Sequence, residues 1–285
     1  MKRSSKVGIA AVMLIAIGTV ASIVTYKGEK AEPFEMKEEA PAHFSSIRAT
    51  ADNAYVTIKP ASDDKAKAVL TGTKKENRTV KLKSFIKDNQ WHIVAKERPS
   101  IFFNIDFFQG RRQLKIYLPK KEYEKLYALT DNGKISINRI NSKSIEAQSD
   151  NGKIEIAHLN ANSIKAETAN GRIILNDTQG KIEARADNGL ISFKDTKGKI
   201  VARTENGKID FTNPTITDSL DFTTDNGKIQ LELQTEPKNL QLEARTDNGG
   251  ISIFGKEYKN SAAIFGAGPH VNLQTDNGRI DVSTD

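Results

Sequence analysis

Each of eight Asn-Gly dipeptides between residues 132 and 277 is flanked by side chains that could bind ions. The residue before the Asn is usually acidic, and the residue after the Gly is usually basic. Calcium prefers roughly six to eight oxygen ligands, so one carboxylate per repeat beside a Lys is a poor cation site. The Gly-Gly-x-Gly-x-Asp pattern of calcium-binding β-roll repeats is also absent. We therefore predict no metal site, and we expect the acidic and basic columns to neutralise each other.

Side chains that usually carry catalysis are sparse. The chain has no Cys, and His43, His92, His158 and His270 are scattered without metal-ligand spacing or an adjacent carboxylate cluster. Neither a Gly-x-Ser-x-Gly motif nor a phosphate-binding loop is present. We predict a protein that is not an enzyme, with no catalytic residues, no cofactor-binding residues and no cofactor. A β-helical enzyme acting on polysaccharides is the alternative, because such enzymes use Asp, Lys and Arg without a short motif.

One segment is a candidate binding site for a ligand that the sequence does not identify. The run IFFNIDFF holds four of the twelve Phe, and two Arg follow it. An exposed apolar tip beside cations would dip into a membrane or dock a partner. The same run also fits a pair of core strands. The candidate residues are Phe102, Phe103, Phe107, Phe108, Arg111 and Arg112.

These residues must be positioned by a repeat, because the Asn-Gly dipeptides recur at nearly constant spacing. Successive gaps are 19, 19, 18, 18, 20, 22 and 29 residues, a signature of stacked repeats. Stacked repeats form rods and extended surfaces more readily than deep clefts. The Asn positions are 132, 151, 170, 188, 206, 226, 248 and 277.

Around each Asn the apolar residues alternate with polar ones. Ile stands three residues after every Asn, an apolar residue stands five after it, and further apolar residues stand four and six before it. This spacing of two on both sides predicts two short strands per repeat, each with one buried face. Asn-Gly suits the intervening turn because both residues tolerate positive φ.

Two all-β architectures satisfy this pattern. In an antiparallel meander, the residues two before and three after each Asn would pair across the turn. In a β-solenoid, each repeat is one coil and equivalent residues stack about 4.8 Å apart. We favour the solenoid, because open sheets rarely exceed about 10 strands and no amphipathic helices cover the apolar face.

The N-terminus carries a candidate membrane anchor. Residues 7–26 have no charge and follow a tail, residues 1–6, that contains Lys2, Arg3 and Lys6. About 20 apolar residues span a bilayer, and the preceding positive charges favour a cytoplasmic N-terminus. A cleaved signal peptide is the alternative. We expect a single-pass membrane protein with the bulk of the chain extracytoplasmic.

The part beyond the anchor divides by composition. Residues 27–42 are charged and aperiodic, which predicts a solvated linker. Residues 43–125 contain alternating strands without the regular Asn-Gly frame, so we expect an N-terminal β module. Residues 126–285 form the repeat domain, in which residues 254–269 (including Phe254, Tyr258, Ile264 and Phe265) are expected to cover the last coil.

Positive charge is concentrated in the N-terminal part of the chain. Residues 1–128 hold 24 Lys and Arg against 14 Asp and Glu, whereas residues 129–285 hold 19 against 22. Outside a membrane, the expected partners of a basic surface are anionic lipids or anionic wall polymers. Solubility and protection of strand edges are the structural alternative. Nucleic acid is excluded by the compartment and by the lack of a binding motif.

Several phrases in the chain carry a family resemblance. They are AYVTIKP, LKIYLPKKEYEKLYALTDNGKISI, the repeated DNGKI units and GAGPHVNLQTDNGRI. Over about residues 45–285 the chain resembles the bacterial putative-adhesin family of β-strand-repeat proteins, also called toast-rack domains. The resemblance implies a right-handed β-helix-like fold, an association with envelope-stress systems and their membrane proteins, and no catalytic residues. The gap of 29 residues before the last repeat departs from the regular period.

These observations predict a membrane-anchored interaction or scaffold protein of the bacterial cell envelope that is not an enzyme. An adhesin for external surfaces is the main alternative.

Overall fold

The computed structural model describes residues 32–40, 43–74, 78–99 and 112–284, which contain sixteen β-strands in one mixed sheet. No helix in this part of the chain is long and apolar enough to cross a membrane. The expected anchor, residues 7–26, lies outside the described residues. The strands are β1 Glu32–Glu39, β2 Ser46–Ala51, β3 Ala54–Pro60, β4 Lys67–Lys74, β5 Arg78–Lys87, β6 Gln90–Pro99, β7 Arg112–Leu118, β8 Tyr123–Asn132, β9 Ile135–Asn138, β10 Ser142–Lys197, β11 Ile200–Asn213, β12 Leu220–Leu233, β13 Gln241–Ile253, β14 Lys256–Tyr258, β15 Ser261–Ile264 and β16 His270–Thr284.

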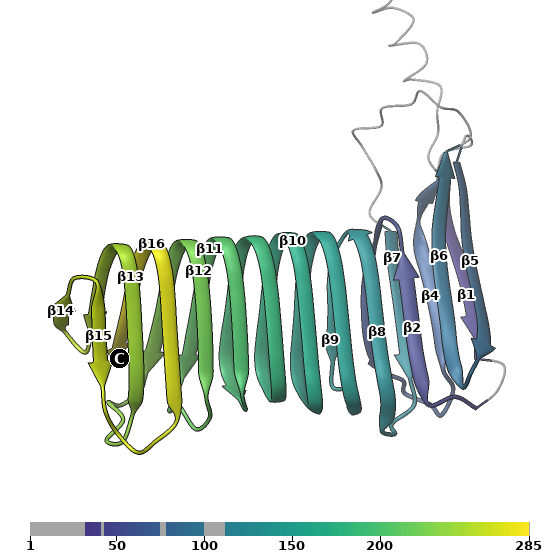
Figure 1. Cartoon of the computed structure of the whole chain (residues 1–285). Coiled ribbons are helices and arrows are strands. Elements are labelled where there is room, and N and C mark those ends of the chain that lie inside the picture. The colour runs from purple at the N-terminus through teal and green to yellow at the C-terminus, as the bar shows by residue number, and fades with distance from the viewer. Residues whose placement is uncertain (1–31, 41–42, 75–77, 100–111, 285) are drawn as a thin grey trace, which may run out of the picture.

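The repeats stack as parallel coils in a rod (Figure 1). Asn151 pairs with Asn132 of the coil before it, and Asn206 pairs with Asn188. The residues on either side of each turn therefore pair with their equivalents one repeat away and not with each other. This confirms the solenoid-like fold over the meander. The right-handed sense of the coil stays a prediction.

Identical residue types stack along the rod because each column has one environment. The Ile residues three after each Asn are all 0% exposed, as are most of the apolar residues five after it. A single hydrophobic core runs through all the coils. Burial of these β-branched side chains on a pleated surface stabilises every coil in the same way.

The Asn side chains form a hydrogen-bonded ladder at one corner of the rod. Asn132 Nδ2 donates to Asn53 Oδ1 at 2.8 Å, and Asn151 Nδ2 donates to Asn132 Oδ1 at 3.0 Å. The same bond recurs, at 3.0 to 3.1 Å, in each further coil up to Asn248. Amide ladders of this kind satisfy donor and acceptor in register along a stack.

The Gly beside each Asn is required by close approach of neighbouring corners. A Cβ on Gly152 would lie 1.7 Å from the carbonyl oxygen of Gly133, and the corner Gly of most other coils meets the same obstacle. A buried Thr two residues before the Asn adds a bond there. For example, Thr246 Oγ1 donates to the Gly278 carbonyl at 3.2 Å. The corner therefore holds adjacent coils in one register.

The repeat begins earlier than the Asn-Gly pattern indicates. Strands β2 and β3 pair in parallel with β8 and β9, and Asn53 begins the ladder. The frame of apolar residues around Asn53 is intact, but Ala54 replaces the Gly. The hydrogen bonds between strands and the hydrophobic core are therefore continuous across residues 125 and 126, where the sequence analysis divided the N-terminal module from the repeats.

Antiparallel strands close the N-terminal end. Strand β5 pairs with β6, β4 pairs with β7, and β1 pairs with β4. Strand β1 lies in the segment that the sequence indicated as a linker. Its Phe34 and Met36 alternate with charged residues and pack against the core, which a count of charges conceals. The change to antiparallel pairing ends the parallel stack (Figure 1).

At the C-terminal end, the order of the strands in space differs from their order in the sequence. Strand β16 lies between β12 and β13, so the end coil is β13 and not the last strand of the chain. Strands β14 and β15 pair antiparallel with β13 and cover it. The expected cover therefore lies over the penultimate repeat. Phe254 and Ile264 pack against the core, whereas Tyr258 and Phe265 are 38% and 87% exposed.

The corner requirement is testable at two adjacent glycines. A Cβ on Gly249 would lie 1.7 Å from the Gly278 carbonyl oxygen, whereas a Cβ on Gly250 would meet nothing closer than 3.5 Å. We expect Gly249→Ala to reduce the free energy of unfolding by roughly 3 kcal/mol or more, because backbone must move. Gly250→Ala should change it by less than about 0.5 kcal/mol. Urea unfolding of both variants measures this, and equal losses would contradict the close-approach argument.

Candidate functional site

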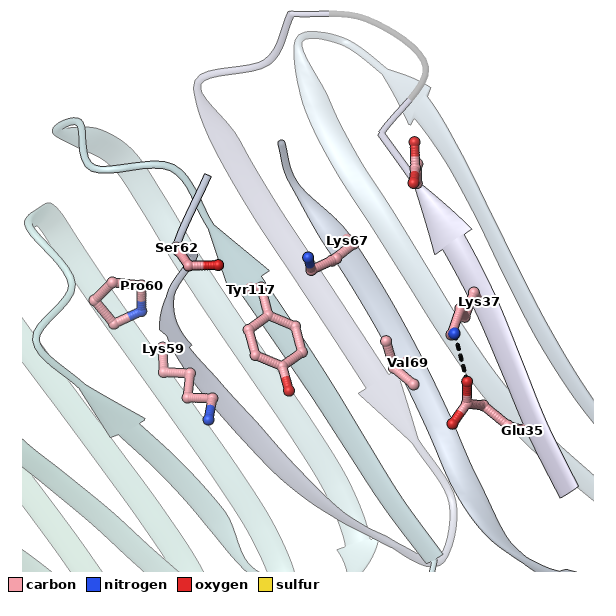
Figure 2. Close-up of a pocket in the computed structure, with 9 residues that line it drawn as sticks. Glu35, Lys37, Lys59, Pro60, Ser62, Lys67, Val69 and Tyr117 are labelled. Atoms are coloured by element: carbon pink, nitrogen blue, oxygen red, sulfur yellow. Dashed lines mark ion pairs between the residues drawn. The ribbon is translucent and has the colours of Figure 1, made fainter. Parts of the chain in front are cut away.

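Two outer faces at the N-terminal end of the rod carry depressions. The first is a groove of about 660 Å³ on β1, β3, β4 and β7 (Figure 2). The ring of Tyr117 lies in this groove with Lys59 Nζ 5.1 Å and Lys67 Nζ 5.5 Å from its centroid. Cations near an aromatic face are attracted by its quadrupole. Lys59 and Lys67 therefore already interact with an aromatic ring of the groove.

The charges of this groove are largely satisfied within it. Lys37 Nζ lies 2.6 Å from Glu35 (Figure 2), and Lys67 Nζ lies 3.4 Å from Asp63. The hydrogen bond to Glu35 and its charge raise the pKa of Lys37. Glu39 adds a further negative charge to the lining. The groove presents mixed charge and does not favour an anionic or a cationic ligand.

The second face is the outer surface of the β5–β6 hairpin. In β5, Val80 and Leu82 point into the core, so the alternating Lys81 and Lys83 point to solvent. In β6, Trp91, Ile93 and Ala95 are buried, which turns His92, Val94 and Lys96 outward. Period-two alternation in two paired strands thus brings these side chains to one face.

This face carries a cationic depression of about 430 Å³. It is lined by Thr79, Lys81, Lys83, Phe85, Val94 and Lys96, and no acidic residue lines it. Lys81 stands directly opposite Lys96 across the hairpin. None of the three Lys makes an ion pair with any other residue in the described ranges.

The arrangement is electrostatically unfavourable for folding alone. Like charges directly opposite in a sheet destabilise it, and an unbalanced local arrangement is typical of a functional surface. Residues 79–85 (TVKLKSF) alternate in the sequence, but this alternation does not reveal the partner strand. Knowledge of the register between Lys81 and Lys96 was needed to find the site.

An aromatic pair borders the cationic depression. The rings of Phe85 and His92 stack with centroids 4.8 Å apart and an interplanar angle of 3°. Burial, followed by the charges of Arg48 and Lys87, lowers the pKa of His92, and Asp88 opposes this only in part. His92 is therefore neutral at neutral pH and extends the apolar part of the face. The lowered pKa also reflects the positive field there.

Of the six candidate binding residues predicted from the sequence, only Arg112 lies in the part of the chain that the structure describes. Phe102, Phe103, Phe107, Phe108 and Arg111 lie outside the described residues. Arg112 begins β7, and its Nη2 donates to Glu97 Oε1 at 2.8 Å while Nη1 donates to Oε2.

Arg112 is therefore a structural residue and not a surface cation. The Arg112 and Glu97 side chains are each 6% exposed. The burial of an Arg at the start of a core strand, between Arg111 and Gln113, could not be predicted from the sequence. The ion pair joins the end of β6 to the start of β7.

The charged columns along the coils differ from the prediction that the acids before each Asn and the bases after each Gly neutralise each other. The basic residues after each Gly pair mainly with the acid two positions further along the repeat. This acid lies either in the same coil, as in Lys208 with Asp210, or in the neighbouring coil, as in Lys228 with Asp281, both at 2.6 Å. The basic residues do not neutralise the acids before each Asn. Burial, together with the charges of Asp52 and Asp150, consequently raises the pKa of Asp131. No group of three His, Asp or Glu in the described ranges is placed to hold a metal ion.

Comparison with known proteins identifies relatives of the whole rod. The family model described as Toastrack DUF4097 matches residues 44–283. No curated protein matches the chain. A solved putative adhesin from Bacteroides fragilis is 12% identical, with 89% of this chain and 97% of that chain covered and a TM-score of 0.52.

Two further structures come from Parabacteroides distasonis. A putative adhesin is 13% identical, with 90% of this chain and 98% of that chain covered and a TM-score of 0.45. A putative lipid binding protein is 11% identical, with coverage of 89% and 97% and a TM-score of 0.48. At these identities the likeness concerns the fold alone.

Because the acids before the Asn residues are not neutralised, we expect that removing one of these charges stabilises the protein. Because the pKa of Asp131 is raised on folding, its carboxylate destabilises the fold above the folded pKa, and this penalty disappears as the pH falls through that value. We expect Asp131→Asn to stabilise the protein at pH 7 by about 0.5 kcal/mol, allowing for screening. At a pH of about 3 the substitution should have little effect.

Glu155→Gln is the matched control. Burial raises the pKa of Glu155, but the hydrogen bonds and charges of Lys134 and Lys153 outweigh this and lower it overall. Its contribution is present above the unfolded pKa and is lost as the pH falls through the folded pKa. Glu155→Gln should therefore destabilise the protein at pH 7. Urea unfolding at both pH values measures the pair, and destabilisation by Asp131→Asn would contradict the argument.

The Arg112 pair predicts a large structural cost. Removing one partner leaves a buried carboxylate uncompensated, so Arg112→Ala should lower the free energy of unfolding by about 3–5 kcal/mol. Arg185 is 60% exposed and makes two long ion pairs, so Arg185→Ala should cost less than about 1 kcal/mol. Urea unfolding compares the two variants. Similar small losses would show that Arg112 does not hold β6 to β7.

Proposed function

Because the chain belongs to the toastrack DUF4097 family, we propose that it is a membrane-anchored, extracytoplasmic interaction protein of the bacterial cell envelope. In this proposal the protein is not an enzyme. Its N-terminal end binds anionic envelope components, and the rack of coils is a rigid support that presents a repetitive polar surface.

The observation that carries the proposal is the unpaired cationic face of the β5–β6 hairpin. Three Lys surround one depression without an acid in its lining. The comparable groove on the opposite face pairs its cations with Glu35, Asp63 and a Tyr ring. An anionic polymer or surface would relieve the repulsion between Lys81 and Lys96. Of the two depressions described above, the one on the hairpin is lined by Lys without an acid.

The tether supports a position close to the membrane. Residues 7–26 are apolar and follow three positive charges, which favours an anchor with a cytoplasmic N-terminus. Strand β1 begins at Glu32. Five intervening residues span at most about 18 Å when fully extended. The cationic end of the rod therefore belongs next to the membrane, and the coils extend from it.

A connection with envelope stress forms part of the proposal. The whole chain resembles LiaG, an anchored protein from envelope-stress operons of Bacillus-type bacteria. We propose that other membrane proteins of such a system are partners of the rod. An adhesin function would instead place the affinity for external surfaces in the repeats. A polysaccharide-acting enzyme would need clustered carboxylates and basic groups at a concave face.

The test is retention of the full-length chain, in detergent, on an immobilised polyanion such as polyphosphate. We expect retention at low salt that weakens strongly at moderate salt, because exposed charges are screened within about 10 Å at 0.1 M. The triple variant Lys81→Ala, Lys83→Ala, Lys96→Ala should lose most of the retention. No retention of the unmodified chain at low salt would overturn the proposal.

A matched triple variant distinguishes the faces. Lys165→Ala, Lys208→Ala and Lys228→Ala remove the same charge from the rack, where each Lys has an acidic partner. Retention should be nearly unchanged in this variant. If the rack variant loses retention and the hairpin variant does not, the affinity lies in the repeats, as the adhesin alternative requires.

A further inference from the structure

We infer that the outer face of the β5–β6 hairpin docks on anionic lipid headgroups of the membrane that holds the anchor, with Phe85 entering the interface. This inference rests on the proposed function and narrows it to one partner. It also assigns an orientation, because docking through a side wall lays the N-terminal part of the rod along the bilayer.

The apolar part of the face distinguishes a bilayer from a soluble polymer. Phe85 is 47% exposed, although it lies within strand β5. Val94 shares the depression with it, and neutral His92 stacks on its ring. A soluble polyanion offers nothing for these groups to enter. A bilayer interface accepts an aromatic side chain at the level of the headgroups.

The cations surround this apolar centre in the manner of an interfacial site. Lys81, Lys83 and Lys96 line the depression, and Lys87 lies further along the same outward side of β5. Arg48 stands opposite His92 on the adjoining strand β2. Each Lys or Arg near an anionic leaflet adds attraction that decays within a Debye length. The site therefore combines apolar and electrostatic contacts, as stable membrane attachment requires.

The position of the hairpin in the rod makes this contact geometrically accessible. Strand β5 lies at the same end as β1 (Figure 1), and Ser84 Oγ donates to Glu38 Oε2 of β1 at 3.0 Å. Only five residues separate the expected anchor from β1. A short tether raises the effective concentration of the face at the bilayer, so individually weak contacts suffice. The mixed-charge groove beside β1 has no comparable attraction to lipid.

The absence of Cys from the sequence allows a clean test. A spin label on Val94→Cys reports on the hairpin face, and one on Thr57→Cys reports on β3 of the opposite wall. Each full-length chain is inserted through its own anchor into nanodiscs of phosphatidylcholine, alone or with phosphatidylglycerol. The measurement is the accessibility of the label to a water-soluble nickel complex.

We expect accessibility at position 94 to fall several-fold only in the discs with phosphatidylglycerol, and accessibility at position 57 to stay constant. Adding Lys81→Glu, Lys83→Glu and Lys96→Glu should restore it. Phe85→Ser should restore it in part, whereas a purely electrostatic contact would be insensitive to that change. Equal accessibility of position 94 in both discs would overturn the inference.

Soluble polyphosphate, added to discs of phosphatidylcholine alone, separates this inference from the proposed function. If polyphosphate protects position 94 and the anionic bilayer does not, the face binds a soluble anionic polymer. The proposed function then stands and the lipid inference fails. If neither protects the label, the proposed electrostatic function fails as well.

Discussion

The close approach of neighbouring coils at the Asn-Gly corner is the constraint on which the rest of the rod depends. The backbone of one corner lies so near the next that a Cβ on Gly152 would penetrate the Gly133 carbonyl. The Asn side-chain amides of neighbouring coils can then hydrogen-bond to one another in register. Once the corner is fixed, side chains at equal distances from it must stack. The single Ile column and the continuous core follow from that register.

Uniform stacking has a consequence for function, because it repeats the same chemistry along the rod. Charges on the rack pair within or between coils, as Lys134 does with Glu155 and Lys165 with Glu167. A different arrangement of charges arises where the repeat ends. At the N-terminal end, antiparallel strands replace the parallel coils, and their outward residues are free of the column pattern. The cationic hairpin face is therefore a property of the cap and not of the repeat.

The contrast between the uniform coils and the ends of the rod also explains which structural features could be predicted from the sequence. Alternation around each Asn predicted two half-buried strands per repeat, and the constancy of each column favoured a solenoid. Strand β1 was missed because its Phe34 and Met36 are outnumbered by charges. Asn53 was missed because Ala54 stands where other coils have Gly. The placement of β16 could not be predicted, since in a parallel stack any coil can pair with any other of matching pattern.

The sequence by itself determined the coil, because the residue types at each corner and in each apolar column are local requirements that recur within a few residues. Only the tertiary structure decided the order of coils at the C-terminal end, the burial of Arg112 against Glu97 and the position of Lys81 opposite Lys96. Each of these depends on which strand lies beside another. That choice is made by contacts between residues distant in sequence, so no local pattern records it.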